Sequence, residues 1–204
     1  MKPRLNLFPL LFLAGAILTA CTPAEENPHD LFFENLAAHC GNAYQGKVTV
    51  GDPALDSGWM RANIVIEVKE CTDDRIRIPL HVDNDHSRTW VISRTTEGLS
   101  LKHDHRNEDG SEDLVNGYGG NTIAIGSATH QVFPIDDYSK LMFSEHGMVA
   151  SVTNTWVISF PNEQTLRYQL MRENRDFQVE IDLSKPVETP PAPWGWRDHE
   201  TYTW

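Results

Sequence analysis

Short runs in which every second residue is apolar recur along the chain after residue 43. Such alternation is typical of a strand with one buried face, since successive side chains point to opposite sides of a sheet. The runs cover residues 44–50, 64–68, 76–82, 89–95, 99–105, 123–133, 152–160, 166–170 and 177–183. The pattern therefore predicts an all-β domain of about nine antiparallel strands. Because tight turns join most successive runs, we expect an up-and-down barrel or a strongly curved sheet.

Two segments interrupt the alternation with helical spacing. Asp30 is a suitable N-cap for a short N-terminal helix over residues 31–39, which ends near Gly41. Residues 134–146 predict a second short helix or an irregular crossover. Residues 117–120, Gly-Tyr-Gly-Gly, lack the Lys-Ser/Thr pair of a phosphate-binding loop, and we interpret them as a flexible turn.

The N-terminus has the pattern of a targeting segment. Lys2 and Arg4 precede an apolar run over residues 5–18 that is too short to span a bilayer comfortably. Residues 18–21, Leu-Thr-Ala-Cys, then resemble the lipobox of bacterial lipoproteins. This resemblance implies cleavage before Cys21 and acylation of that cysteine, so that its acyl chains hold the protein on the lipid bilayer. The alternative is an ordinary secretory signal peptide that contains a cysteine.

The same segment divides the chain. We expect a lipoprotein signal peptide over residues 1–20, a polar tether over 21–29, a β-barrel-like domain over 30–187 and a tail rich in Pro and Trp over 188–204. The predicted location is a bacterial cell envelope. Thr22, rather than Asp, follows the cysteine. In Gram-negative lipoproteins this implies the outer membrane, with the protein facing the periplasm or the cell surface.

With Cys21 assigned to lipid, Cys40 and Cys71 remain as a pair. In an oxidising compartment such a pair predicts a structural disulfide that fastens the N-terminal helix to the sheet. The alternatives are a metal-binding pair or a reactive thiol, and neither has a CxxC spacing or supporting ligands to favour it.

The charge of the chain excludes one class of partner. There are 29 acidic side chains against 17 basic ones, and the formal net charge is −12. Nucleic-acid binding requires clusters of Lys and Arg that neutralise phosphates. No such cluster is present in the sequence, so we expect no nucleic-acid partner.

The order of the predicted elements resembles the calycin group, which includes the lipocalins. A helix is followed by a first strand that contains Tyr44-Gln45-Gly46 and then by a meander of further strands. The resemblance implies a barrel that holds a small apolar ligand. Lys47 and Val48 follow Gly46, whereas lipocalins carry Gly-x-Trp near this point, so no binding residue of that family is carried over. Residues 101–110 and 118–120 also resemble a group of uncharacterised bacterial secreted proteins, which implies no function.

The densest group of chemically active residues follows the strand over residues 99–105. Leu99, Leu101, His103 and His105 share one face of that strand, so an apolar face ends in two imidazoles. Arginines nearby could pair with an anion, and aromatic residues on other strands are expected to point inward. The candidate ligand-binding residues are Trp90, Arg94, His103, His105, Arg106, Trp156 and Tyr168.

A transition-metal site is the alternative use of the same histidines. His103 and His105 can reach one ion, and a third ligand could come from His81, His86 or an acid of the loop over residues 108–113. In that loop the candidates are Glu108 and Asp109. Surface or structural histidines beside a solvated loop would show the same sequence pattern. No Gly-x-Ser-x-Gly, HExxH or phosphate-binding glycine motif is present, so no catalytic residue is assigned.

Three functions remain open at this stage. The preferred one is a non-enzymatic envelope lipoprotein that binds a small ligand or an envelope protein. The second is a metal-dependent hydrolase or isomerase that uses His103 and His105. The third is a structural or assembly lipoprotein acting through its aromatic tail, which contains Trp194, Trp196 and Trp204. Alternatively, one or two of those tryptophans pack back on the barrel.

Overall fold

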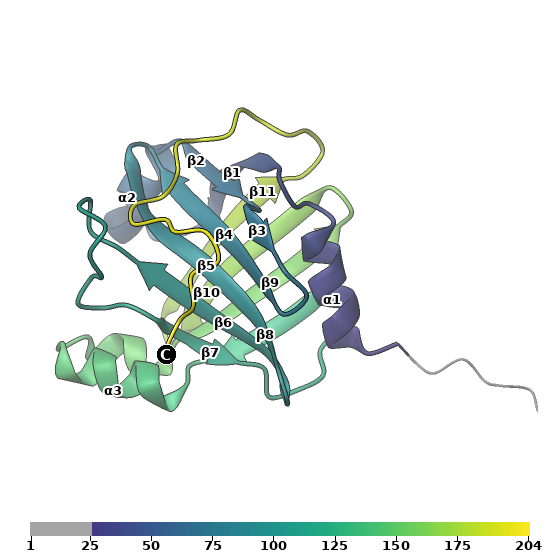
Figure 1. Cartoon of the computed structure of the whole chain (residues 1–204). Helices are drawn as coiled ribbons and strands as arrows, with labels where there is room; N and C mark the ends of the chain where they lie inside the picture. Colours follow the sequence, from purple (N-terminus) through teal and green to yellow (C-terminus); the bar gives the residue numbers. More distant parts are fainter. Residues whose placement is uncertain (1–25) are drawn as a thin grey trace, which may run out of the picture.

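The computed structural model describes residues 26–204, and its strands form a nearly closed antiparallel barrel (Figure 1). Ten strands follow one another around the barrel, and β3 pairs with β4 outside this path. The strands are β1 (Ala43–Val50), β2 (Ile64–Glu67), β3 (Glu70–Cys71), β4 (Arg75–Val82), β5 (Asp85–Thr95), β6 (Gly98–His105), β7 (Tyr118–Asn121), β8 (His130–Pro134), β9 (Thr155–Asn162), β10 (Thr165–Arg172) and β11 (Arg175–Asp182). The predicted all-β, up-and-down architecture is confirmed.

The barrel closes in two different ways at its two seams. β11 returns to β1 through an antiparallel ladder that includes Gly46 opposite Ile181 and has a register shift between Val48 and Val50. Between β7 and β8 there is one bridge, Gly120 to Ile135, and a hydrogen bond from the Asp136 N–H to the Gly119 oxygen at 3.1 Å. A Cβ on Gly120 would lie 1.9 Å from the Pro134 oxygen, so only glycine allows this approach. The prediction of a flexible turn at residues 117–120 is therefore wrong.

One half of the barrel is a filled apolar core. Its inward-facing residues alternate along each strand as predicted, and most of them are fully buried. The set includes Ile64, Ile66, Ile76, Ile78, Ile92, Leu99, Leu101, Ile158 and Ile181. This half therefore has the dense interior that stabilises a small domain.

Helix α1 (Pro28–Ala37) seals the filled half at one end. Phe32 and Leu36 are fully buried in the core. The helix begins earlier than predicted because Asn27, not Asp30, is the N-cap: its side chain accepts a hydrogen bond from the His29 N–H at 2.9 Å. The predicted disulfide between Cys40 and Cys71 is confirmed and links the end of α1 to β3.

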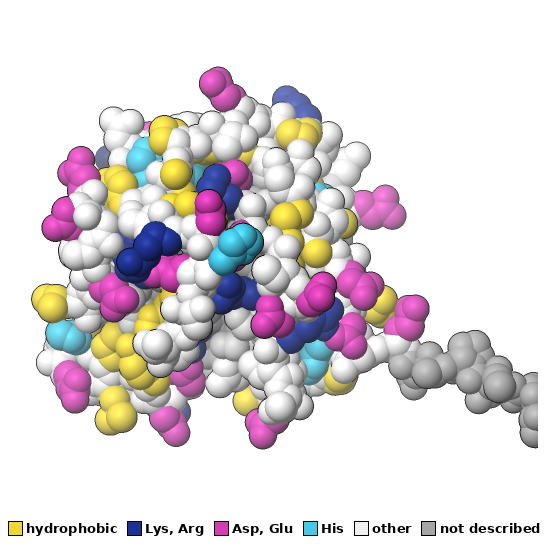
Figure 2. Space-filling model, viewed as in Figure 1, with side chains coloured by type: hydrophobic (Ala, Val, Ile, Leu, Met, Phe, Trp, Pro, Cys, Tyr) yellow, Lys and Arg dark blue, Asp and Glu magenta, His cyan; other side chains and the backbone are white. Residues whose placement is uncertain are grey.

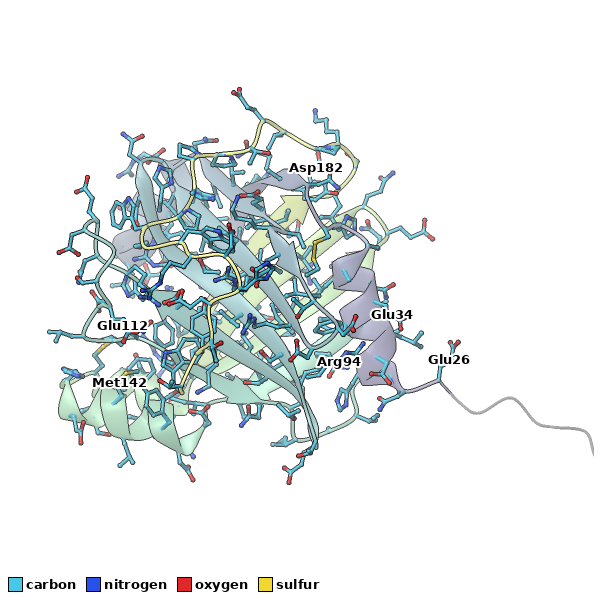
Figure 3. All side chains as sticks on the ribbon, in the orientation of Figure 1. Glu26, Glu34, Arg94, Glu112, Met142 and Asp182 are labelled. Carbon is cyan, nitrogen blue, oxygen red and sulfur yellow. A yellow bond between two sulfur atoms is a disulfide. The ribbon has the colours of Figure 1, made fainter. Side chains whose placement is uncertain are left out.

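The opposite end of the barrel carries the remaining helices. α3 (Asp137–Glu145) confirms the second predicted helix, and the short 3-10 helix η1 (Val149–Thr153) follows it. α2 (Pro53–Arg61), between β1 and β2, was not predicted. Figure 3 shows Arg94 beside α1, whereas Glu112 and Met142 lie toward the α3 end.

The strand predicted over residues 123–133 is only partly correct. Ile123 and Ile125 are 84% and 55% exposed and lie in the loop between β7 and β8. Their alternation therefore does not mark a buried face. The strands on either side of this loop are β7 and β8, and Phe133 of β8 is fully buried.

The C-terminal segment crosses the outer face of β4, β5 and β6 (Figure 1). The Trp196 ring centre lies 3.6 Å from the Arg77 guanidinium carbon, and the Tyr202 hydroxyl donates to Asp104 at 3.1 Å. Figure 2 shows charged side chains of both signs on this face of the molecule. The prediction that tryptophans of the tail pack back on the barrel is confirmed.

The predicted signal peptide, the acylated Cys21 and most of the tether lie outside the described residues. Within residues 26–204, no helix is both long and apolar enough to cross a membrane.

Candidate functional site

An aromatic pair crosses the interior where the filled half of the barrel ends. Trp90 comes from β5 and Tyr168 from β10, which lie on opposite sides of the barrel. Their rings stack with centres 4.5 Å apart and an angle of 4° between the planes. On the α1 side of this pair the interior is a packed apolar core, and on the other side two cavities open.

The two cavities adjoin each other, and we call them together the mouth cavity. The inner cavity has a volume of about 220 Å³ and the outer one about 320 Å³. Both are lined by Arg88, Tyr118, Tyr168 and Leu170. The inner cavity is further lined by Asp56, Trp59, Leu80, Trp90, His103, Arg175, Phe177 and Val179. The outer cavity is further lined by His105, Asp113, Val115, Phe143, Met148, Ser151, Asn154, Trp156 and Arg172.

His103 contacts Tyr118 and Tyr168, two tyrosines that line the inner end of the mouth cavity, which we call its floor. Its ring stacks on Tyr118 at 4.5 Å, and its Nδ1 donates to the Tyr118 carbonyl oxygen at 3.1 Å. Because that carbonyl can only accept, Nε2 is the unprotonated nitrogen and accepts from the Tyr168 hydroxyl at 3.0 Å. Burial lowers the pKa of His103 to about 3, so the ring is neutral near pH 7. Both ring nitrogens are engaged within the protein.

His105 lies one layer closer to the opening. Its Nδ1 is 3.7 Å from an Asp113 carboxylate oxygen, and its backbone N–H donates to Asn116 at 2.7 Å. Burial lowers the pKa of His105, and the positive charge of Arg88 lowers it further. His105 is therefore a neutral polar group on the wall of the outer cavity at pH 7.

Three arginines surround the opening, and their partners differ. Arg88 pairs with Asp85 at 2.6 Å, and Arg175 forms a two-point ion pair with Asp56. Arg172 donates to Asn154 at 3.0 Å. Among residues 26–204, no carboxylate lies within 4.0 Å of the Arg172 guanidinium. Of the three arginines, Arg172 is therefore the one without a carboxylate partner among the described residues.

Helix α2 lies over the inner cavity. Its Asp56 is buried, and the hydrogen bonds from Arg175 hold the pKa of that carboxyl below its usual value. Trp59 packs edge-on against Phe177 with ring centres 5.6 Å apart. These two contacts fasten α2 to the β10–β11 hairpin.

The structure brings five of the seven predicted ligand-binding residues to the mouth cavity. They are Trp90, His103, His105, Trp156 and Tyr168. The other two predicted residues do not join them. Arg94 is at the α1 end, where it pairs with Asp30, and Arg106 is on the outer face, bonded to Asp104 at 2.7 Å.

Sequence reasoning missed Arg88, Arg172 and Arg175. Arg88 shares the inward face of β5 with Trp90, so the period of that strand could have identified it. Arg172 and Arg175 are paired opposite each other at the β10–β11 turn. Near a turn, the alternation of residues along a strand does not tell whether a side chain points into the barrel or into solvent.

The two loop residues predicted as metal ligands, Glu108 and Asp109, do not lie with the histidines, and Asp113 is the acidic residue of that loop beside His105. Glu108 and Asp109 are exposed, and Asp109 accepts hydrogen bonds from Ser111 at 2.9 and 2.6 Å. In the part of the chain that the structure describes, no group of three or more His, Cys, Asp or Glu side chains is placed to hold a metal ion.

The comparisons with known proteins add nothing to this site. No family model, curated protein or solved structure matches the chain.

Proposed function

We propose that the chain is a lipid-anchored envelope protein whose barrel binds a small ligand in the mouth cavity. The observation that carries this proposal is the stacked pair of Trp90 and Tyr168, which separates a filled core from a cavity at the opposite end. A barrel that only needed stability would gain from filling both halves.

The walls of the cavity suit a partly apolar molecule. Trp59, Trp90, Trp156 and Phe177 supply aromatic surface, and a few polar groups stand among them. The inner and outer volumes of about 220 and 320 Å³ fall together within the range of small-ligand sites, roughly 300–1,000 Å³. The floor is rigid because His103 fixes both Tyr118 and Tyr168.

A binding role fits the groups in the cavity better than catalysis does. His103, the most buried histidine there, uses both ring nitrogens within the protein and has a pKa of about 3. It is therefore a poor general base near pH 7. The metal-dependent alternative would need ligands that the described residues do not bring together.

The test is a titration with the neutral fluorescent probe N-phenylnaphthylamine. The full chain is placed in phosphatidylcholine nanodiscs, and empty nanodiscs give the background. We expect saturable binding that the Leu170→Trp variant weakens at least tenfold, because Leu170 lines both cavities. Leu141→Trp is the matched control, since Leu141 is 66% exposed on α3. Binding that is absent, or equal in both variants, would refute the proposal.

A further inference from the structure

Resting on that binding function, we infer that the mouth cavity selects ligands that carry an anionic group, which Arg172 and Arg88 bind. Both arginines line the outer cavity, and Arg88 also lines the inner one. The inference depends on which N–H donors of these two guanidiniums form no hydrogen bond within the protein.

Arg172 is the arginine of the opening that lacks a countercharge. It is half-buried at the end of β10, and its Nη1 donates to the Asn154 side chain at 3.0 Å. Within residues 26–204 it forms no ion pair. A guanidinium presents five N–H donors in a fixed planar arrangement that matches carboxylates, sulfonates and phosphates. Most of the Arg172 donors are therefore available to a ligand.

Arg88 keeps part of its donor set free although it is ion-paired. Its Nη1 donates both to Asp85 at 2.6 Å and to the Ser87 hydroxyl at 2.9 Å. Its Nε and Nη2 donate to no group in the described part of the chain. Arg175 differs, because both of its terminal nitrogens are taken by Asp56 at 2.5 and 2.6 Å.

The acidic groups of the opening do not compensate Arg172. Asp56 and Asp85 each hold another arginine, and Asp113 lies beside His105. Asp113 also lines the outer cavity and has no cationic partner there, because His105 is neutral at pH 7, but it lies more than 4.0 Å from the guanidiniums of Arg88 and Arg172. A cationic ligand that reached Asp113 would therefore also face both arginines. An anion would gain charge-assisted hydrogen bonds from both, and the apolar walls at Trp156 and Leu170 would strengthen these by limiting water.

A matched pair of probes tests the inference. Anilinonaphthalene sulfonate has nearly the same aromatic framework as N-phenylnaphthylamine and carries one additional sulfonate. The full chain in phosphatidylcholine nanodiscs is titrated with each probe, and signal that persists in the Leu170→Trp variant is subtracted. We expect the sulfonate to bind about tenfold more tightly than the neutral probe, a factor that corresponds to about 1.4 kcal/mol.

Arginine variants then locate the anion. Arg172→Met is expected to abolish the preference for the sulfonate, measured as the ratio of the two probes' affinities in the same variant, and Arg172→Lys is expected to keep part of that preference. The control is Arg167→Met, because Arg167 is on the outer face of the same strand, paired with Glu180 at 2.6 Å. Thermal unfolding of each variant verifies that it is folded before titration.

The possible failures are distinct. If the neutral probe binds but the sulfonate is not preferred, or if Arg172→Met weakens both probes equally, the anion inference is overturned and the proposed binding function stands. If neither probe binds above the subtracted signal, both are overturned. If Arg167→Met removes the preference as Arg172→Met does, the anion is not bound by Arg172.

Discussion

Trp90 and Tyr168 stack 4.5 Å apart although they belong to strands on opposite sides of the barrel. The contact ties the two walls together and limits how far they can separate. It also marks the level at which the interior changes from a packed core to a cavity. The position of the Tyr168 ring is further set by the hydrogen bond from its hydroxyl to His103. Stability and ligand binding therefore depend on the same layer of side chains.

Tyr168→Phe tests the hydrogen bond in this layer. The ring and its stack on Trp90 are kept, but Nε2 of the buried His103 loses its donor at 3.0 Å. An unsatisfied buried acceptor costs about 1–3 kcal/mol. We expect the free energy of unfolding, measured by urea denaturation, to fall by that amount.

The control for this experiment is Tyr138→Phe. The Tyr138 hydroxyl also donates a hydrogen bond, to the Asn116 oxygen at 3.1 Å, but the residue is 46% exposed, so water can replace the lost donor. Equal losses of stability in the two variants would contradict a special role for the His103–Tyr168 bond.

The buried histidines predict how stability depends on pH. Burial lowers the pKa of His103 to about 3 and that of His81 to about 4, whereas an unfolded histidine titrates near 6.5. Between these values the unfolded chain binds protons that the folded chain does not, so stability is full above about pH 6.5 and falls as the pH is lowered toward 4. Urea unfolding at several pH values measures this slope.

An NMR titration shows directly whether the His103 ring stays neutral. The ring resonances of His103 are expected to stay at their neutral positions down to the acid limit of the folded state. A His103 resonance that titrates near pH 6.5 would contradict the burial of a neutral ring between Tyr118 and Tyr168.

The alternation of apolar residues predicts which face of a strand is buried but not which end of the barrel is open. Arg88 and Arg94 share the inward face of β5, yet Arg88 lines the cavity and Arg94 pairs with Asp30 below α1. How far an inward residue lies from the open end of the barrel depends on where α1 packs. That packing is a tertiary contact, which the alternation along one strand does not show. For this reason the alternation along β5 does not distinguish Arg88, which lines the cavity, from Arg94, which does not.

Other errors have local physical causes. β7 contains Gly119 and Gly120, which have no side chains to show a period, and it forms because the backbone of Leu101 and Pro134 approaches them closely. α2 has a clear start at Asp52-Pro53, but Leu55 is 68% exposed and the helix buries little apolar surface. The ion pair between Asp56 and Arg175 holds the helix against the barrel, and no sequence pattern predicts this ion pair.

Removal of the disulfide tests how firmly α1 is held. The bond between Cys40 and Cys71 closes a loop with a sequence separation of 31 residues. In the chain-entropy model such a crosslink stabilises the fold by roughly 3–4 kcal/mol. We expect the Cys40→Ala, Cys71→Ala double variant to lose stability by about that amount in urea unfolding. An unchanged midpoint of unfolding would mean that Phe32 and Leu36 suffice to hold the helix.

The last prediction concerns the tail. The Glu200 side chain is only 9% exposed and accepts from Arg106 at 2.9 Å, next to the Arg106–Asp104 ion pair. Arg77, which is fully buried beneath the tail, lies 3.9 Å from the same carboxylate. Glu200→Gln keeps the shape but removes the charge that two buried guanidiniums face. Because hydrogen bonds to charged groups contribute about 1.5–3 kcal/mol, we expect a loss of stability in that range.

Glu188→Gln is the matched control for Glu200→Gln, since Glu188 is exposed and forms no ion pair in the described residues. It should change the free energy of unfolding by less than about 0.5 kcal/mol. Limited proteolysis gives a second measurement, because a loosened tail is cut more rapidly between residues 188 and 204. If Glu200→Gln changes neither stability nor cleavage, the tail is held by Trp196 on Arg77 and by Tyr202 on Asp104 rather than by its carboxylate.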